Sequence, residues 1–88
     1  MEETARAMEL KDTVPMMMSA DYKERFRAEV YQLGTRISKL ESMLSSWAAG
    51  ELNFQPTCSY DLLEAQLNSM KVYMHFLTER AKIESIEL

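Results

Sequence analysis

Two segments of the chain carry apolar residues at alternating intervals of four and three positions. In the first segment these residues are Phe26, Val30, Leu33, Ile37, Leu40, Leu44 and Trp47. In the second they are Leu63, Leu67, Met70, Met74, Leu77 and Ala81. This spacing places each set on one face of an α-helix and is typical of helices that pack as coiled coils. The pattern therefore predicts two long helices that pack antiparallel.

Capping and breaking residues set the expected bounds of the first long helix and the loop. Ser19 is a good N-cap, and Asp21 and Glu24 follow it in the first turn, where the helix dipole favours acidic side chains. Gly50 is a suitable residue for the C-terminal end. We expect the first long helix over 19–49 and a loop over 50–58.

The remaining bounds follow from similar signals. Ser59 or Asp61 caps the second long helix, which we expect over 59–85. The N-terminal segment, 1–18, begins with good helix formers, and Pro15 predicts a break in the helical pattern over 12–18. The sequence thus predicts a single all-α domain over 1–88, an antiparallel helical hairpin with a short N-terminal helix.

Apolar residues outside the two heptad patterns predict self-association. The surplus consists of Tyr22, Tyr31, Met43, Leu62, Val72, Tyr73 and Phe76. A chain of 88 residues has a marginal core of its own. The single Cys58 forms no intramolecular disulfide, and one His with one Cys does not favour a structural metal site. We therefore expect a helical homo-oligomer.

Charge and composition reduce the range of possible functions. The net charge of −4 does not favour binding to DNA or RNA. Long apolar runs and a signal-peptide pattern are both lacking, which predicts a cytoplasmic protein without a membrane span. His75 is the only histidine, and Cys58 has no base adjacent in sequence, so catalytic, metal-ligating and cofactor-binding residues are not expected. We expect that the protein is not an enzyme.

Basic and aromatic residues are the best candidates for ligand binding. Arg25, Arg36 and Lys39 fall along one side of the first long helix, and Tyr22 and Tyr73 could supply stacking faces near them. The alternative is ordinary surface charge neutralised by nearby glutamates. From the residues alone, the prediction is a helical oligomer with a basic and aromatic cluster.

A longer motif carries a resemblance to a known family. Tyr22-Lys-Glu-Arg-Phe26 and Arg36-Ile37-x-Lys39-Leu40 lie in the first helix, and Gln66-Leu67-x-x-Met70-x-x-Tyr73-x-x-x-Leu77-x-x-Arg80 lies in the second. Over about residues 20–82 the chain resembles small phage helical-hairpin proteins and the anti-CBASS cyclic-oligonucleotide sponge proteins. The run in the second helix is the discriminating part.

The resemblance implies a function and a set of residues. Sponge proteins of this kind bind cyclic dinucleotides, and in some cases cyclic trinucleotides, without cleaving them, and assemble as helical hexamers with ligand pockets between protomers. Their ligand-contacting residues correspond by motif to Tyr22, Lys39 and Arg80. The N-terminal segment and the Pro-containing loop depart from the family pattern.

The expected function is therefore that of a phage-encoded immune-evasion sponge in the host bacterial cytoplasm, with Tyr22, Arg25, Arg36, Lys39, Tyr73 and Arg80 as candidate ligand-binding residues. Two alternatives are a helical protein that binds and blocks a host protein and a structural phage accessory protein. In an antiparallel hairpin Arg80 lies near Tyr22 and Arg25, while Lys39 lies about four helical turns away. We expect Arg80 and Lys39 to meet only across an interface or to serve separate pockets.

Overall fold

The computed structural model describes residues 8–88 and contains only helical elements over this range. A 3-10 helix, η1 (Leu10–Thr13), runs into the short α2 (Val14–Met17), and two long helices follow, α3 (Tyr22–Ala48) and α4 (Tyr60–Glu84). The all-α prediction is confirmed. The part of the expected N-terminal helix over 1–7 lies outside the described residues.

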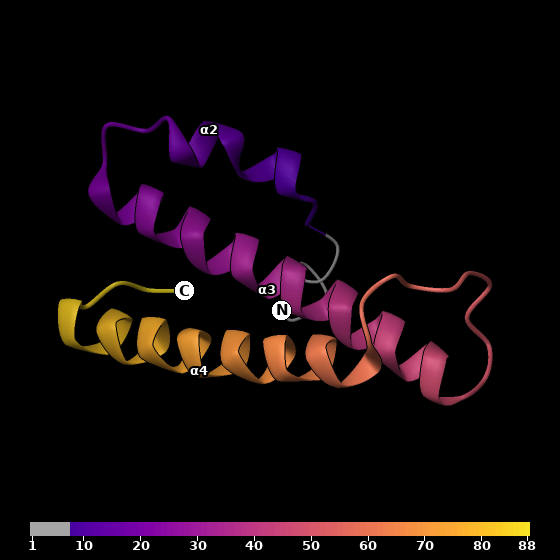
Figure 1. Ribbon diagram of the computed structural model, residues 1–88. Coiled ribbons are helices and arrows are strands. Elements are labelled where there is room, and N and C mark those ends of the chain that lie inside the picture. The colour runs from indigo at the N-terminus through magenta and orange to yellow at the C-terminus, as the bar shows by residue number, and fades with distance from the viewer. Residues whose placement is uncertain (1–7) are drawn as a thin grey trace.

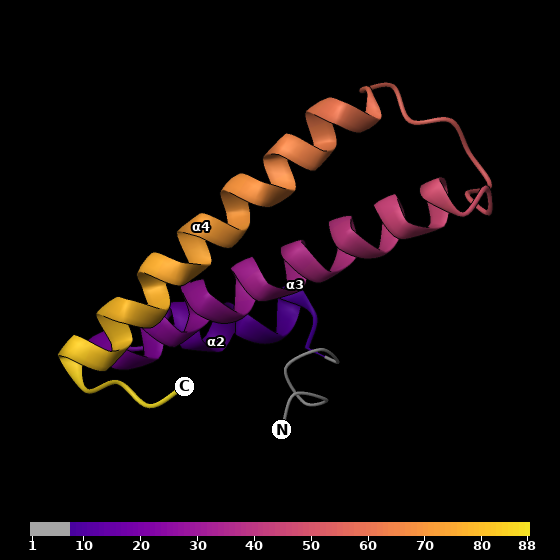
Figure 2. The same cartoon turned by 90° about the horizontal axis from the view of Figure 1, so that it is seen from below.

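The helix α3 lies at the centre of the fold. Figure 1 shows η1 and α2 along one side of α3. The helix α4 lies along the other side and runs antiparallel to α3. Figures 1 and 2 together show that α3 and α4 cross at an angle and that the connection over 49–59 joins them at one end. The two long helices therefore form a hairpin that is packed at both ends, with the start of α3 beside the end of α4.

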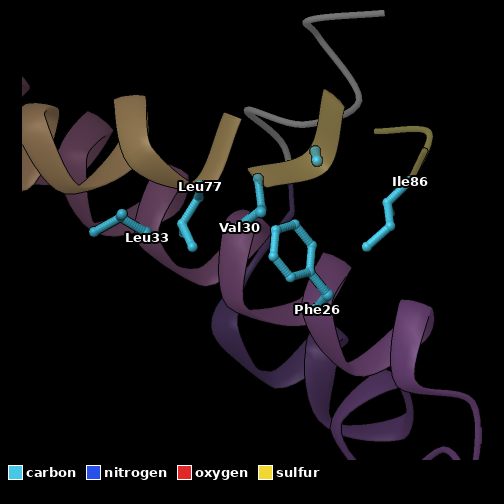
Figure 3. Close-up of a cluster of buried hydrophobic side chains, with 6 residues drawn as sticks. Phe26, Val30, Leu33, Leu77 and Ile86 are labelled. Atoms are coloured by element: carbon cyan, nitrogen blue, oxygen red, sulfur yellow. The ribbon is translucent and has the colours of Figure 1, made fainter. Parts of the chain in front are cut away.

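The hydrophobic core cluster lies where α3 begins and α4 ends (Figure 3). Its buried residues are Phe26, Val30, Leu33, Leu77, Ala81 and Ile86. All except Ile86 belong to the two heptad patterns, so the patterns predicted the packed faces of α3 and α4 correctly. Nearer the connection Leu44 and Leu67 are also buried, and the rings of Trp47 and Tyr60 meet edge to face at 5.3 Å between centroids.

A second face of α3 is covered by the N-terminal segment. Thr13 is completely buried there, and its hydroxyl donates a hydrogen bond to the Leu10 carbonyl oxygen at 2.7 Å. The Gln32 side-chain amide donates to the same hydroxyl at 2.8 Å, and the Thr35 hydroxyl donates to the Met8 carbonyl oxygen at 3.1 Å. These polar contacts fix η1 against α3 in a defined register, because buried polar groups need partners.

The long helices begin at residues that differ in part from those expected. The cap of α3 is Asp21, whose carboxylate accepts a hydrogen bond from the Lys23 amide, whereas Ser19 accepts from the Asp21 amide and shapes the preceding turn. The helix therefore starts at 22 and not at 19. At α4 the Ser59 hydroxyl accepts from the Leu62 amide at 3.1 Å, so Ser59 is the cap.

The expected break over 12–18 is wrong, because the chain is helical from Leu10 to Met17. Pro15 is the second residue of α2. In the first turn of a helix the backbone amide has no intrahelical partner, so proline costs no hydrogen bond there, and its fixed φ suits the helix.

Both long helices end in a left-handed residue. Gly50, with φ of 75°, follows α3, and the amide of Glu51 donates to the Ser46 carbonyl oxygen at 2.8 Å. Ser85, with φ of 57°, follows α4, and the amide of Ile86 donates to the Ala81 carbonyl oxygen at 2.8 Å. This turn is the Schellman arrangement, and at α4 it returns Ile86 to the core cluster that includes Ala81.

Substituting the two glycines by alanine should have opposite effects. A Cβ built on Gly34, inside α3, would lie 3.7 Å from the Met74 Cε, which is ordinary van der Waals contact. Gly34→Ala should therefore stabilise the fold by about 1 kcal/mol through helix propensity and raise the melting temperature by roughly 4–8 °C. Gly50→Ala should lower it, since left-handed backbone costs an L-residue about 1–2 kcal/mol. Thermal unfolding followed by circular dichroism measures both effects. A lower melting temperature for Gly34→Ala would show that position 34 cannot accommodate a side chain.

Candidate functional site

An open groove crosses α3 between η1 and α4. Its volume is about 370 Å³, within the usual range for small-molecule sites. Polar side chains at its surface are Thr35, Arg36, Lys39 and Gln66, and apolar ones are Leu10, Leu40, Met43 and Met70. We call it the Lys39 groove. Two cationic groups suit phosphate oxygens, the carboxamide suits the polar edge of a base, and the methionines are adaptable apolar surface.

The Lys39 ammonium is already paired inside the protein. Its Nζ lies 3.2 Å from Oε1 of Glu9, which precedes η1. The Lys39 and Glu9 side chains are 63% and 54% exposed, so solvent screens the pair. Exposed pairs of this kind contribute about 0–1 kcal/mol to the stability of a fold. Another anion can therefore replace the Glu9 carboxylate at little cost in free energy.

A smaller groove adjoins the first one at Arg36. It has a volume of about 140 Å³ and is lined by Glu29, Gln32, Leu33, Arg36 and Tyr73. We call it the Tyr73 groove. Arg36 is exposed and borders both grooves, so one residue links the two. The combined surface has a cation at its centre, a second cation on one side and an aromatic ring on the other.

Tyr73 is held in place by α3. Its hydroxyl donates a hydrogen bond to the Glu29 carboxylate, and the ring remains 44% exposed. This hydrogen bond raises the pKa of Tyr73, because loss of the phenolic proton would leave two anions in contact; desolvation and the charge of Glu29 act in the same direction, and the charge of Arg80 opposes them. Tyr73 therefore presents a neutral, oriented ring to the groove.

Arg80 and Tyr22 form a separate cluster where α3 begins and α4 ends. The Arg80 Nη2 donates to the Tyr22 hydroxyl at 3.0 Å, and that hydroxyl donates to the Glu84 Oε1 at 2.8 Å. Arg80 Nε also pairs with the Glu84 Oε2 at 3.4 Å, and its guanidinium carbon lies 4.9 Å from the centroid of the buried Phe26 ring. These contacts tie the end of α4 to the start of α3.

The six candidate residues therefore fall into separate places. Arg36 shares one groove with Lys39 and the other with Tyr73, whereas Arg80 lies beside Tyr22, as antiparallel packing predicts. Arg25 borders neither groove, and its Nη1 donates to the Ser19 carbonyl oxygen at 2.8 Å in the turn before α3.

The family assignment comes from the two long helices. A family model described as Sequestin matches residues 20–83, which span all of α3 and nearly all of α4. The chain belongs to the Sequestin family. No curated protein and no solved structure matches it. The name of the Sequestin family indicates a sequestering protein, which agrees with the resemblance to sponge proteins.

The Sequestin match covers some residues of the grooves and not others. Arg36, Lys39, Gln66 and Tyr73 lie within it, whereas Glu9 and Leu10 lie outside. Sequence reasoning missed Gln66 as a groove residue, although it begins the discriminating run in the second helix. It also missed Glu9 and Glu29, since a carboxylate that pairs with a distant lysine or tyrosine leaves no local pattern.

Residues 8–88 lack two kinds of feature. This range contains no group of three histidine, cysteine or acidic side chains close enough to hold a metal ion. It also contains no helix with the length and apolar character needed to cross a membrane.

The contact with Glu29 should make Tyr73 titrate above the ordinary range for tyrosine. A raised pKa in the folded state means that the contact stabilises the fold below about pH 10, the ordinary tyrosine value, and that this contribution is lost as pH rises through the higher folded value. Comparing the phenolate absorbance of wild type and Tyr73→Phe as pH rises identifies the transition that belongs to Tyr73. The Glu29→Gln variant should lower the pKa of that transition. An unchanged highest-pH transition in Tyr73→Phe would contradict the assignment.

Proposed function

We propose that this protein binds and sequesters cyclic oligonucleotide second messengers without cleaving them. The observation that carries the proposal is the position of Arg36, which borders both the Lys39 groove and the Tyr73 groove. Membership in the Sequestin family supports sequestration, and the resemblance to the anti-CBASS sponge proteins supports the class of ligand. On this proposal the protein is phage-encoded and acts in the cytoplasm of the host bacterium.

The chemistry of the ligand matches the groups around Arg36. A cyclic dinucleotide carries two phosphate charges and two bases. Arg36 and Lys39 provide cations for phosphate oxygens, with Arg36 able to bind in a bidentate manner. The exposed ring of Tyr73 offers a stacking surface, which is worth about 1–3 kcal/mol for a base. Capture of this kind needs affinity and no proton transfer.

Arg80 and Tyr22 belong to a second pocket on this proposal. The Arg80 guanidinium already contacts Glu84, so a ligand phosphate would have to replace that carboxylate. Arg25, next to the same end of α3, would add charge to this pocket. Two pockets would allow rings of two sizes, cyclic dinucleotides and cyclic trinucleotides, to bind independently.

The proposed working form is a homo-oligomer, with a hexamer as the expected stoichiometry. The resemblance to hexameric sponges supports this number, and the exposed apolar residues of α4 support the need for a partner surface. The same exposed residues also support a second candidate function, in which the helical surface binds and blocks a host protein.

Recovery of the ligand distinguishes these functions. The protein is incubated with a panel of cyclic dinucleotides, cyclic trinucleotides and related nucleotide messengers, and the bound fraction is released by heat and identified by mass. We expect intact recovery of at least one ligand together with a raised melting temperature. If no messenger in the panel binds, the sponge function is wrong and the protein-blocking function is favoured. If a bound messenger returns cleaved, the protein is an enzyme.

Loss of single cations should weaken binding without unfolding the protein. Arg36→Ala and Lys39→Ala each remove a charged contact worth about 1.5–3 kcal/mol, which corresponds to roughly 10–150-fold in affinity. Arg80→Ala should weaken a different ligand, in keeping with separate pockets. Calorimetric titration of the ligand from the panel measures these losses. Lys71→Ala is the matched control, because Lys71 pairs with Glu41 at 2.8 Å and borders neither groove.

Removing the charge of Glu9 should strengthen binding in the Lys39 groove. A ligand phosphate must compete with the Glu9 carboxylate for the Lys39 ammonium. Because an exposed pair contributes at most about 1 kcal/mol, Glu9→Gln should tighten binding by up to about fivefold. The double variant Glu9→Gln with Lys39→Ala should lose this gain. Weaker binding by Glu9→Gln than by wild type would contradict this competition.

A further inference from the structure

A second heptad row runs along α4, apart from the row that packs on α3. Its members, at alternating intervals of three and four, are Leu62, Ala65, Ser69, Val72, Phe76, Glu79 and Ile83. We call this set the outer row. At 100° per residue it lies on roughly the opposite side of α4 from the buried Leu67, Leu77 and Ala81.

The large side chains of the outer row are exposed and mostly apolar. Leu62, Val72 and Phe76 are 59%, 54% and 59% exposed, and Ile83 is 82% exposed. In Figures 1 and 2 the described elements lie on the α3 side of α4, which leaves the other side uncovered by residues 8–88. Large apolar side chains repeated at heptad spacing are typical of a helix that packs against a second helix as well as the first.

The order of residues in the outer row makes it complementary to itself in one orientation. In an antiparallel pair of heptad helices the first position of one helix faces the fourth position of the other. With a two-fold axis at the level of Met74, Val72 faces Phe76 of the second copy, and Ala65 faces Ile83 of the second copy. Small residues thus meet large ones, as dense packing requires.

The polar members of the outer row meet in the same register. Ser69 faces Glu79 of the second copy, so the hydroxyl can donate a hydrogen bond to the carboxylate. Glu79 is half-buried. Its carboxylate forms an ion pair with Lys82 of the same helix, with 3.2 Å between Oε2 and Nζ. In a parallel pair each residue would instead face its own counterpart, and the two Glu79 carboxylates would repel each other.

We propose that the outer row binds a second copy of this chain, with the two α4 helices antiparallel about a two-fold axis near Met74. The self-complementary order of sizes and of polar groups selects a second copy over an unrelated helix. This interface is separate from the two cations of the proposed ligand site, because Arg36 and Lys39 lie on α3 and outside the outer row. Loss of the dimer contact therefore does not by itself abolish the charged grooves.

A charge placed in the outer row should break this interface. Phe76→Glu should reduce the mass of the particle in solution, measured by light scattering at micromolar concentration, to half or less of the wild-type mass, with unchanged helix content by circular dichroism. Phe54→Glu is the matched control, since Phe54 has a similar exposure of 56% but lies in the connection; it should keep the wild-type mass. A wild-type monomer, or a Phe76→Glu variant of wild-type mass, overturns the proposal.

Cysteine crosslinking tests the orientation. In a Cys58→Ser background, a mixture of the Ser69→Cys and Glu79→Cys chains should give a mixed dimer with a short thiol-specific crosslinker, and Ser69→Cys alone should not. In the antiparallel register two residues at position 69 lie about 15 Å apart along the axis. Glu64→Cys mixed with Ser69→Cys is the control and should not crosslink. Efficient crosslinking of Ser69→Cys to itself, or none in the mixture, overturns the antiparallel contact.

Discussion

The packing of α3 against α4 through Phe26, Val30 and Leu77 positions every other part of the molecule. These side chains are at most 7% exposed, and they bring the start of α3 and the end of α4 into contact. Toward the connection Leu44 and Leu67 are also buried and the rings of Trp47 and Tyr60 meet, so the packing continues along the hairpin (Figure 2). Arg36 and Lys39, in the middle of α3, lie beside this packed face and are exposed, and the grooves lie there. The register of α3 against α4 therefore determines which side chains border the grooves.

The N-terminal segment completes the Lys39 groove, although it lies outside the Sequestin match. Its position depends on the buried Thr13 hydroxyl, which accepts from Gln32, and on the contact of Thr35 with the Met8 backbone. Once η1 is fixed in this way, Leu10 becomes a wall of the groove and Glu9 reaches Lys39. A segment added to the shared hairpin thus changes both the shape and the charge of the groove.

Heptad spacing predicted the packed faces of both long helices, because a repeat of apolar residues is a direct consequence of burial on one side. It did not predict Ile86 in the core, since that residue follows the helix and returns only through the left-handed backbone at Ser85. The presence of Pro15 predicts a break over 12–17, yet these residues are helical because proline fits the first turn of a helix, where α2 places it. At the site, the motif contained Arg36, Lys39 and Tyr73, but their division between two grooves depends on distances between helices that local sequence does not encode.

The contacts of each arginine indicate which charges are available to a ligand. Arg80 has its hydrogen-bonding groups directed at Tyr22 and Glu84 and its guanidinium near the Phe26 ring, so much of its capacity is used to hold the hairpin closed. Arg25 is directed at the backbone of the preceding turn. Arg36 borders two grooves instead, with one exposed and weakly paired lysine next to it. Within residues 8–88, a phosphate at Arg36 would displace fewer protein contacts than one at Arg80. Because binding free energy is reduced by every internal contact that must first be broken, we expect on the proposed function that Arg36, and not Arg80, marks the stronger anion site of a single chain.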